Sequence, residues 1–204
     1  MVIKTAGTVS PDCMEITTVS GPSFFIRTIY LSLVNPDDIV DGAEFLDEKE
    51  EELVDAGLCF AVEQKALDYL NRSEQYRMGL TAKLIAKGFA KSNINRALDY
   101  LESKKYLDDR RFAGVWLRNR AITHAEGRSK LSMELAARGI NKTYITEALD
   151  EFFEEISEEE ICMRAFKKCV KTKKDEEKIT QYLLKNGFSI KLIQKVKEDY
   201  GFEK

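Results

Sequence analysis

The stretch from Tyr106 to Ile140 reads YLDDRRFAGVWLRNRAITHAEGRSKLSMELAARGI, and the rest of the chain is best interpreted from it. It predicts two helices that Gly127 separates. Asp108 is placed to cap the first helix by accepting a backbone N–H bond. Gly139 is placed to end the second helix in the left-handed conformation. The same ending, a leucine four residues before a glycine that an apolar residue follows, occurs once before this stretch and once after it.

This recurrence indicates a threefold repeat, which becomes visible when the glycines at 88, 139 and 187 are aligned. Five columns of the alignment then hold apolar or aromatic residues: Leu84/Leu135/Leu183, Phe89/Ile140/Phe188, Ile94/Ile145/Ile193, Ala97/Ala148/Val196 and Leu101/Phe152/Tyr200. Successive glycines are 51 and 48 residues apart, a spacing typical of multi-helix units in helical arrays. We therefore predict three-helix repeats at 58–106, 107–155 and 156–204, stacked as a curved array.

A different pattern precedes the repeats. Residues 14–20 and 24–31 are rich in β-branched and aromatic residues, and a Ser-Gly-Pro-Ser turn between them predicts a β-hairpin. Residues 43–55 predict a short acidic helix that Gly57 ends. Because a lone hairpin is only marginally stable in water, we expect it to pack on the segment after it. The predicted fold class is mainly α, with a small acidic α+β unit at 1–57 in front of the repeats.

The composition fits a globular protein, with 44% apolar and 33% charged residues in a chain of 204. No apolar run is long enough to span a membrane and no signal-peptide pattern is present, so we expect a cytoplasmic location. With a single histidine, His124, and no Cys-x2-Cys pair, we expect neither a transition-metal site nor a cofactor. Cys162 and Cys169 share one helical face and are interpreted as small core residues, with an incidental redox or metal pair as the alternative.

The net charge of −3 conceals a gradient along the chain. Residues 1–60 hold 3 basic and 12 acidic side chains, residues 61–150 hold 17 and 11, and residues 151–204 hold 12 of each. A basic middle section favours a polyanion or an acidic protein surface as partner. The alternative is that helical surfaces are simply rich in lysine and glutamate.

The predicted helix at 109–122 places Phe112 and Trp116 on a core face and three arginines on the opposite face. Guanidinium groups bind phosphates and carboxylates through paired hydrogen bonds, so a dense arginine cluster favours recognition over mere solubility. The candidate partner-binding residues are Arg110, Arg111, Arg118, Arg128, Lys130 and Arg138. We interpret Asp108 and Asp109 as helix-capping residues rather than as a metal-ligand pair, and we expect no catalytic residues.

At these residues the chain resembles a family. YLDDRRFA at 106–113, Gly127-Arg128 with Leu131, and ELAARGI at 134–140 resemble the signature of the RecX regulators of the bacterial recombinase RecA. The segment 66–89, ALDYLNRSEQYRMGLTAKLIAKGF, is similar to the opening pattern of that family. The resemblance implies a non-enzymatic regulator in recombination, DNA repair and the SOS response. It would bind the RecA filament as a curved helical array and lower its ATPase and strand-exchange activity.

Two other functions stay open. The basic central repeats are an alternative site for direct binding of single- or double-stranded DNA, which the acidic N-terminal unit would oppose. A structural adaptor that contacts neither filament nor nucleic acid is the third interpretation. An enzyme is the least favoured class, since the sequence holds no catalytic constellation or phosphate-binding glycine loop. We expect a monomer.

Overall fold

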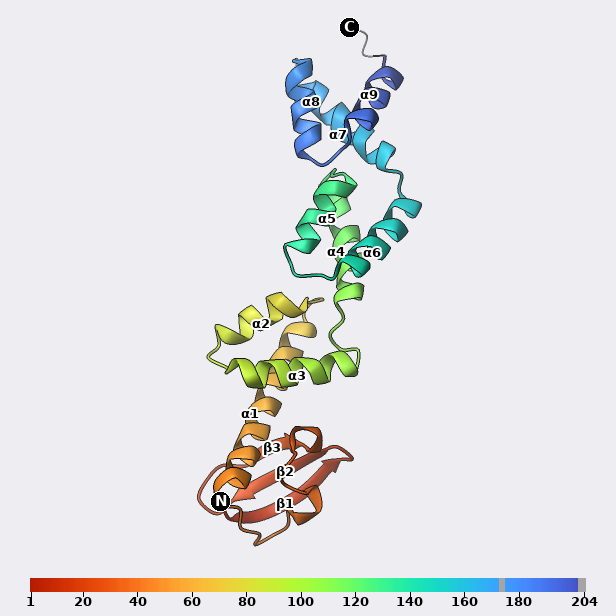
Figure 1. The fold of residues 1–204 in the computed structure, drawn as a ribbon. Helices are drawn as coiled ribbons and strands as arrows, with labels where there is room; N and C mark the ends of the chain where they lie inside the picture. The colour runs from red at the N-terminus through yellow and green to blue at the C-terminus, as the bar shows by residue number, and fades with distance from the viewer. Residues whose placement is uncertain (173–174, 202–204) are drawn as a thin grey trace. The chain divides into compact units, whose positions relative to one another are not determined.

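A computed structural model describes residues 1–172 and 175–201 (Figure 1). Its strands are β1 (Ile3–Ser10), β2 (Cys13–Thr18) and β3 (Phe24–Arg27), followed by short 3-10 turns at Thr28–Tyr30 and Pro36–Asp38. The helices are α1 (Asp47–Leu70), α2 (Arg77–Ile85), α3 (Lys91–Ser103), α4 (Asp109–Thr123), α5 (Arg128–Ala136), α6 (Lys142–Glu155), α7 (Glu158–Thr172), α8 (Glu176–Lys185) and α9 (Ile190–Asp199). The predicted class, mainly helical with a small N-terminal β element, is confirmed.

The N-terminal sheet is antiparallel in the order β1-β2-β3. The predicted hairpin corresponds to β2 and β3, with Ile16 opposite Phe24 and Cys13 opposite Arg27. The strand β1 was not predicted. Most of its side chains are exposed, so it lacks the alternation of apolar and polar residues that marks a half-buried strand. Backbone hydrogen bonds with β2 hold this strand in the sheet, and a buried face of side chains contributes little.

The prediction that Gly57 ends a short acidic helix is wrong, because α1 runs without a break from Asp47 to Leu70. Gly57 lies in the middle of this helix, where β3 packs closely against it. A Cβ at this position would lie 2.9 Å from Cδ2 of Phe24. The glycine therefore admits the aromatic ring, and the prediction mistook a packing requirement for a helix boundary.

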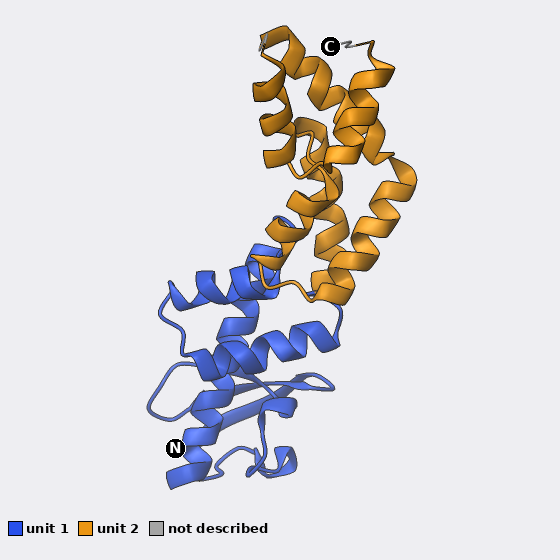
Figure 2. Cartoon of the chain, turned by 45° about the horizontal axis from the view of Figure 1, so that its top comes forward, with its two compact units in different colours: residues 1–107 blue, residues 108–204 orange. Residues whose placement is uncertain are grey.

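Two compact units make up the chain, and Figure 2 colours them separately: Met1–Leu107 and Asp108–Lys204. In the first unit one continuous apolar cluster includes Ile16 and Ile26 of the sheet, Leu53 of α1 and Leu98 of α3. The hairpin thus packs on the helices after it, as predicted. The helix α1 contacts both β3 and α3, so it belongs to the sheet layer and to the first three-helix repeat at once.

A buried ion pair reinforces this junction. Arg27 of β3 donates from Nε and Nη2 to the two carboxylate oxygens of Glu63 on α1, at 2.7 and 2.5 Å. The Glu63 side chain is fully buried. Tyr30 donates to the same carboxylate at 3.3 Å, and the Arg27 guanidinium lies 4.5 Å from the ring centroid of Tyr100 on α3. One arginine therefore joins the sheet to two helices, and removing it would leave the Glu63 carboxylate buried without a charged partner.

The repeat glycines adopt the conformation that the alignment predicted, with φ of +88° at Gly88, +76° at Gly139 and +87° at Gly187. The leucine four residues before each is fully buried. The second unit contains two repeats, α4–α6 and α7–α9, in which α6 packs on α4 and α9 packs on α7. One column fails, since Tyr200 is 43% exposed where Leu101 is buried. The curved stacking and the division at 57, 106 and 155 remain predictions.

Candidate partner-binding site

Asp108 fixes where α4 begins and so fixes which way its arginines point. Its carboxylate accepts hydrogen bonds from the backbone N–H groups of Arg110 and Arg111, at 2.9 and 3.1 Å. These N–H groups have no partner inside the helix, and an aspartate there also suits the positive end of the helix dipole. The predicted capping role of Asp108 is confirmed.

The two faces of α4 divide largely as predicted. Phe112 and Leu117 are buried, at 9% and 0% exposure, while Arg111 and Arg118 are exposed. Trp116 was predicted to lie in the core and is only half-buried. Its indole ring is covered by arginines, because the guanidinium carbons of Arg120 and Arg138 lie 5.6 and 4.8 Å from the ring centroid. Cation–π contacts of this kind stabilise a large aromatic side chain at a solvent-exposed surface.

Arg110 and Arg128 reach α6 from two different helices. Arg110 Nε lies 3.1 Å from Oε2 of Glu147, and its Nη2 lies 3.9 Å from Oε1 of Glu151. Arg128 pairs with Asp150. These pairs are partly exposed, and such pairs are worth about 1 kcal/mol or less. Both arginines are therefore held in place but can exchange their carboxylate for a stronger anionic partner.

Lys130 has a structural role. Its ammonium lies 2.8 Å from Oε1 of Glu126 and donates to Oδ1 of Asn186 at 3.0 Å, so it links the second repeat to the third. Glu126 is 5% exposed and also accepts from Arg120 at 2.7 Å. Burial raises the pKa of Glu126, but the hydrogen bonds from Arg120 and Lys130 outweigh it and lower that pKa to about 2. The Lys130 charge is thus largely neutralised within the fold.

The same junction brings two glycines into contact. The N–H of Gly127 donates to the carbonyl of Asn186 at 2.8 Å. A Cβ at Gly127 would lie 2.5 Å from the carbonyl oxygen of Gly187, and a Cβ at Gly187 would lie 2.5 Å from the backbone nitrogen of Lys130. The backbones of the two repeats therefore approach closely at this point.

The six candidate residues fall into three groups. Arg110, Arg111 and Arg118 are exposed on α4. Arg128 and Arg138 are half-buried, and Arg138 also pairs with Glu134 at 2.9 Å. Lys130 belongs to the junction. The structure thus separates them by environment and does not give six equivalent surface charges.

The acidic partners of these residues escaped the sequence interpretation. The signal for them was the spacing of Glu147, Asp150 and Glu151, which puts three carboxylates on one face of the α6 helix. Arg110 and Arg128 lie more than twenty residues away from them in sequence, so only the packed repeat shows the pairing.

Metal ligands, membrane-spanning helices and reactive thiols are the other features that bear on function. Within residues 1–172 and 175–201, no group of three His, Cys, Asp or Glu side chains is arranged to hold a metal ion. None of the helices described combines the length and apolarity needed to cross a membrane.

Cys162 and Cys169 are both buried, as predicted, and burial raises the pKa of the Cys162 thiol to about 12. A thiol with so high a pKa is a poor nucleophile at neutral pH.

Comparison with known proteins points to one family. A family model described as "RecX, second three-helix domain" matches residues 108–149. "Regulatory protein RecX" of Treponema pallidum is 33% identical over 137 residues, which cover 67% of this chain and 84% of that protein. The protein of the same name from Clostridioides difficile is 27% identical over 178 residues, covering 85% of this chain and 83% of that one.

Solved structures share the fold. A crystal structure of regulatory protein RecX matches with a TM-score of 0.77 at 19% identity, covering 97% of this chain and 98% of that chain. A structure of RecX from Lactobacillus salivarius matches with a TM-score of 0.62 at 20% identity, covering 72% and 98%. At these identities the likeness concerns the fold over the parts that each match covers.

Proposed function

This chain belongs to the RecX family of regulatory proteins, and we propose that it regulates the recombinase RecA by binding the RecA filament. The observation that carries the proposal is the similarity to "Regulatory protein RecX" of Treponema pallidum, of which this chain covers 84% at 33% identity. The family name implies a regulator, and the partner proposed for it is the RecA filament.

The proposed effect is inhibition, in which the bound protein lowers the ATPase and strand-exchange activity of the filament without catalysing a reaction itself. Helical repeats are a common scaffold of proteins that bind extended partners. We place the contact on the second repeat, where Arg110, Arg111 and Arg118 are exposed on one helix.

Arg128 and Arg138 supply the flank of this proposed contact. Each combines an ion pair with an aromatic contact, Arg128 with Phe153 at 5.9 Å and Arg138 with Trp116 at 4.8 Å. Stacked arginines lose little side-chain freedom when they bind a carboxylate or phosphate, because they are already ordered. Lys130 contributes through the junction that positions the others.

Direct binding of DNA by the same exposed arginines is the alternative function. The two functions differ in salt dependence, since contacts with DNA phosphates release counterions and weaken steeply as salt rises. Binding to a protein surface through apolar and hydrogen-bonded contacts falls less.

The test is DNA-dependent ATP hydrolysis by RecA, titrated with this protein at about 50 and 200 mM salt. We expect inhibition at both. Inhibition at far less than one molecule of this protein per RecA monomer would indicate action at filament ends. Inhibition only near one molecule per RecA monomer would indicate coating of the filament. An unchanged rate with the protein in excess at both salt concentrations would contradict the proposal.

Charge reversal locates the contact. Arg110→Glu, Arg111→Glu and Arg118→Glu together should raise the half-inhibitory concentration about tenfold or more. The matched control reverses three exposed lysines of the third repeat, Lys167, Lys171 and Lys191, and changes the net charge equally. If the control weakens inhibition as much as the arginine variant, the contact is not on α4.

A further inference from the structure

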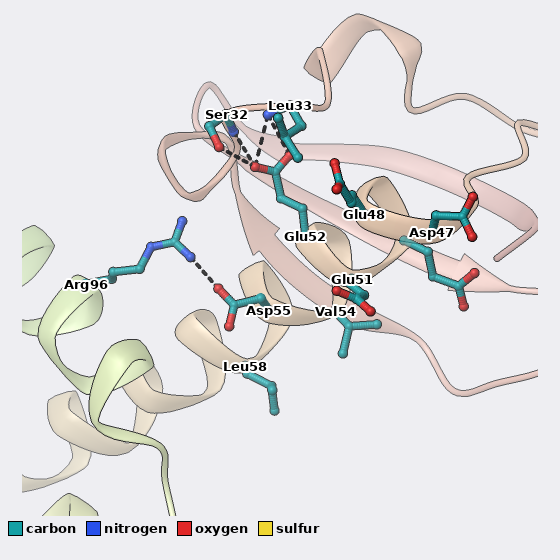
Figure 3. Close-up of a pocket in the computed structure, with 11 residues that line it drawn as sticks. Ser32, Leu33, Asp47, Glu48, Glu51, Glu52, Val54, Asp55, Leu58 and Arg96 are labelled. Carbon is teal, nitrogen blue, oxygen red and sulfur yellow. Dashed lines mark hydrogen bonds and ion pairs between the residues drawn. The ribbon is translucent and has the colours of Figure 1, made fainter.

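A second surface lies far from these arginines in sequence. In the first unit, the beginning of α1 and the loop after the turn at Thr28–Tyr30 line a wide, open groove of about 1140 Å³. Figure 3 shows the residues that line it, with α1 contributing most of them and Arg96 of α3 at one side.

The groove has an apolar component. Leu33, Val54 and Leu58 line it and are 55%, 45% and 49% exposed. Val54 and Leu58 are four residues apart on α1, so they lie on one face of that helix. Exposed apolar side chains gathered in a hollow and rimmed by polar groups are characteristic of interaction sites.

The loop that forms the groove wall is held rigidly. The carboxylate of Glu52 accepts hydrogen bonds from the N–H groups of Ser32, Leu33 and Val34 at 2.7 to 3.0 Å and from the Ser32 hydroxyl at 2.6 Å. Burial raises the pKa of Glu52, but these hydrogen bonds outweigh it and hold that pKa below its usual range. The groove is therefore formed before any partner arrives, which reduces the ordering cost of binding.

Two further carboxylates of the groove have partners within the fold. Glu50 pairs with the N-terminal ammonium at 2.5 Å, and Asp55 pairs with Arg96, whose guanidinium also donates to the carbonyl of Tyr30. By contrast, Asp47, Glu48 and Glu51 are exposed on the first turns of α1. Among the described residues, no hydrogen bond or ion pair engages their side chains.

The acidic residues around the groove indicate which class of partner would bind in it. Residues 1–60 hold 12 acidic and 3 basic side chains, so a nucleic acid is repelled from this end of the chain. The groove is complemented in charge and in apolar surface by a segment of one kind. Such a segment has lysines or arginines opposite the three carboxylates and leucine-like side chains against Leu33, Val54 and Leu58. Basic amphipathic helices are recognised by grooves of this type.

We propose that this groove docks a basic, amphipathic segment of a protein partner. The groove belongs to the first unit and is acidic, whereas the proposed arginine contact belongs to the second unit and is basic. Docking in the groove rests on the geometry of the first unit alone, so its test does not depend on the effect of the protein on RecA.

The test uses the full chain and a fluorescein-labelled peptide of about 14 residues with lysine and leucine at helical spacing, followed by anisotropy. Replacing the three free carboxylates, as Asp47→Asn, Glu48→Gln and Glu51→Gln, should weaken binding about tenfold or more at low salt. The control neutralises three exposed carboxylates of the second unit, Glu154→Gln, Glu155→Gln and Glu198→Gln, and should leave the affinity unchanged.

A further variant separates docking from attraction to a negative surface. Leu58→Ser changes no charge and alters a half-exposed side chain, so the fold should tolerate it while peptide affinity falls about threefold or more. Equal affinity of the wild type and the carboxylate variant would overturn the proposal. So would an unchanged affinity after Leu58→Ser, since the peptide would then respond to charge alone.

Discussion

Gly127 and Gly187 lie where the backbones of two repeats approach so closely that neither position has room for a Cβ atom. Gly127 has an ordinary backbone conformation, with φ of −82°, so its requirement for glycine is a matter of space. The atom that a Cβ would strike is the backbone carbonyl oxygen of Gly187 at 2.5 Å, which cannot rotate away as a side chain would. Any larger residue must therefore push the two repeats apart.

We expect Gly127→Ala to lower the free energy of unfolding of the second unit by about 1–3 kcal/mol, as overpacking does at tight contacts. Urea unfolding followed by far-UV circular dichroism measures the change. Gly114→Ala is the matched control, because Gly114 lies within α4 and its Cβ would meet Arg118 at an ordinary 3.5 Å. That change should raise stability by about 0.5–1 kcal/mol. Equal effects of the two substitutions would contradict this account of the junction.

Glu126 gives the junction a dependence on pH. The pKa of this carboxyl falls from its ordinary 4.5 to about 2 in the folded chain, where it binds Arg120 and Lys130. A group whose pKa is lower when folded adds stability above its unfolded pKa. That contribution is lost as the pH falls from about 5 towards 2, and it amounts to at most about 3 kcal/mol.

The expected result for Glu126→Gln is a less stable second unit at pH 7 and a difference from the wild type that vanishes near pH 2. Unfolding free energies of both proteins, measured between these limits, give the difference directly. Other carboxyl groups titrate equally in the two proteins and cancel. Parallel curves for wild type and variant would show that Glu126 does not carry this effect.

At the scale of the elements, the sequence predicted those helix ends that depend only on residues close to them in the chain. The carboxylate of Asp108 accepts backbone hydrogen bonds from the first turn of α4, and Gly88 and Gly139 have the positive φ angles that end a helix. Each of these features is decided by a residue and neighbours within four positions of it. These helix ends could therefore be predicted from the sequence.

Features decided at long range could not be predicted. Gly57 lies inside the helix α1 and does not end it, and the glycine leaves room for the ring of Phe24, thirty-three residues earlier in the chain. The strand β1 exists because β2 pairs with it, although few of its own side chains are buried. In both cases a partner elsewhere in the chain overrides the local pattern.

The candidate site divides in the same way. Its arginines were recognisable from composition and helical spacing, but the carboxylates that engage Arg110 and Arg128 come from α6. The groove of the first unit was visible only as an excess of acidic residues before position 60. Its apolar component combines Leu33 from the loop with Val54 and Leu58 from α1, and no spacing rule predicts that these residues line one groove.

At the scale of the whole molecule, the chain consists of two units that each have a core of their own. The main apolar cluster of the first unit draws on residues between Ile3 and Leu107. The second unit buries its own set, which includes Leu117, Leu135, Phe166 and Leu183. A core of this kind is what an independently folding domain requires, and about 100 residues is an ordinary domain size.

We therefore expect a fragment of residues 108–204 to fold alone, with a helical circular dichroism spectrum and a cooperative thermal transition. The close approach of Gly127 to Gly187 lies wholly within this fragment. Gly127→Ala should consequently lower the melting temperature of the fragment by the same amount as it lowers that of the second unit in the full chain. An unfolded fragment would mean that the second unit depends on residues 1–107 for its structure. A folded fragment whose melting temperature Gly127→Ala leaves unchanged would contradict the close approach of Gly127 to Gly187 as the cause of the expected loss.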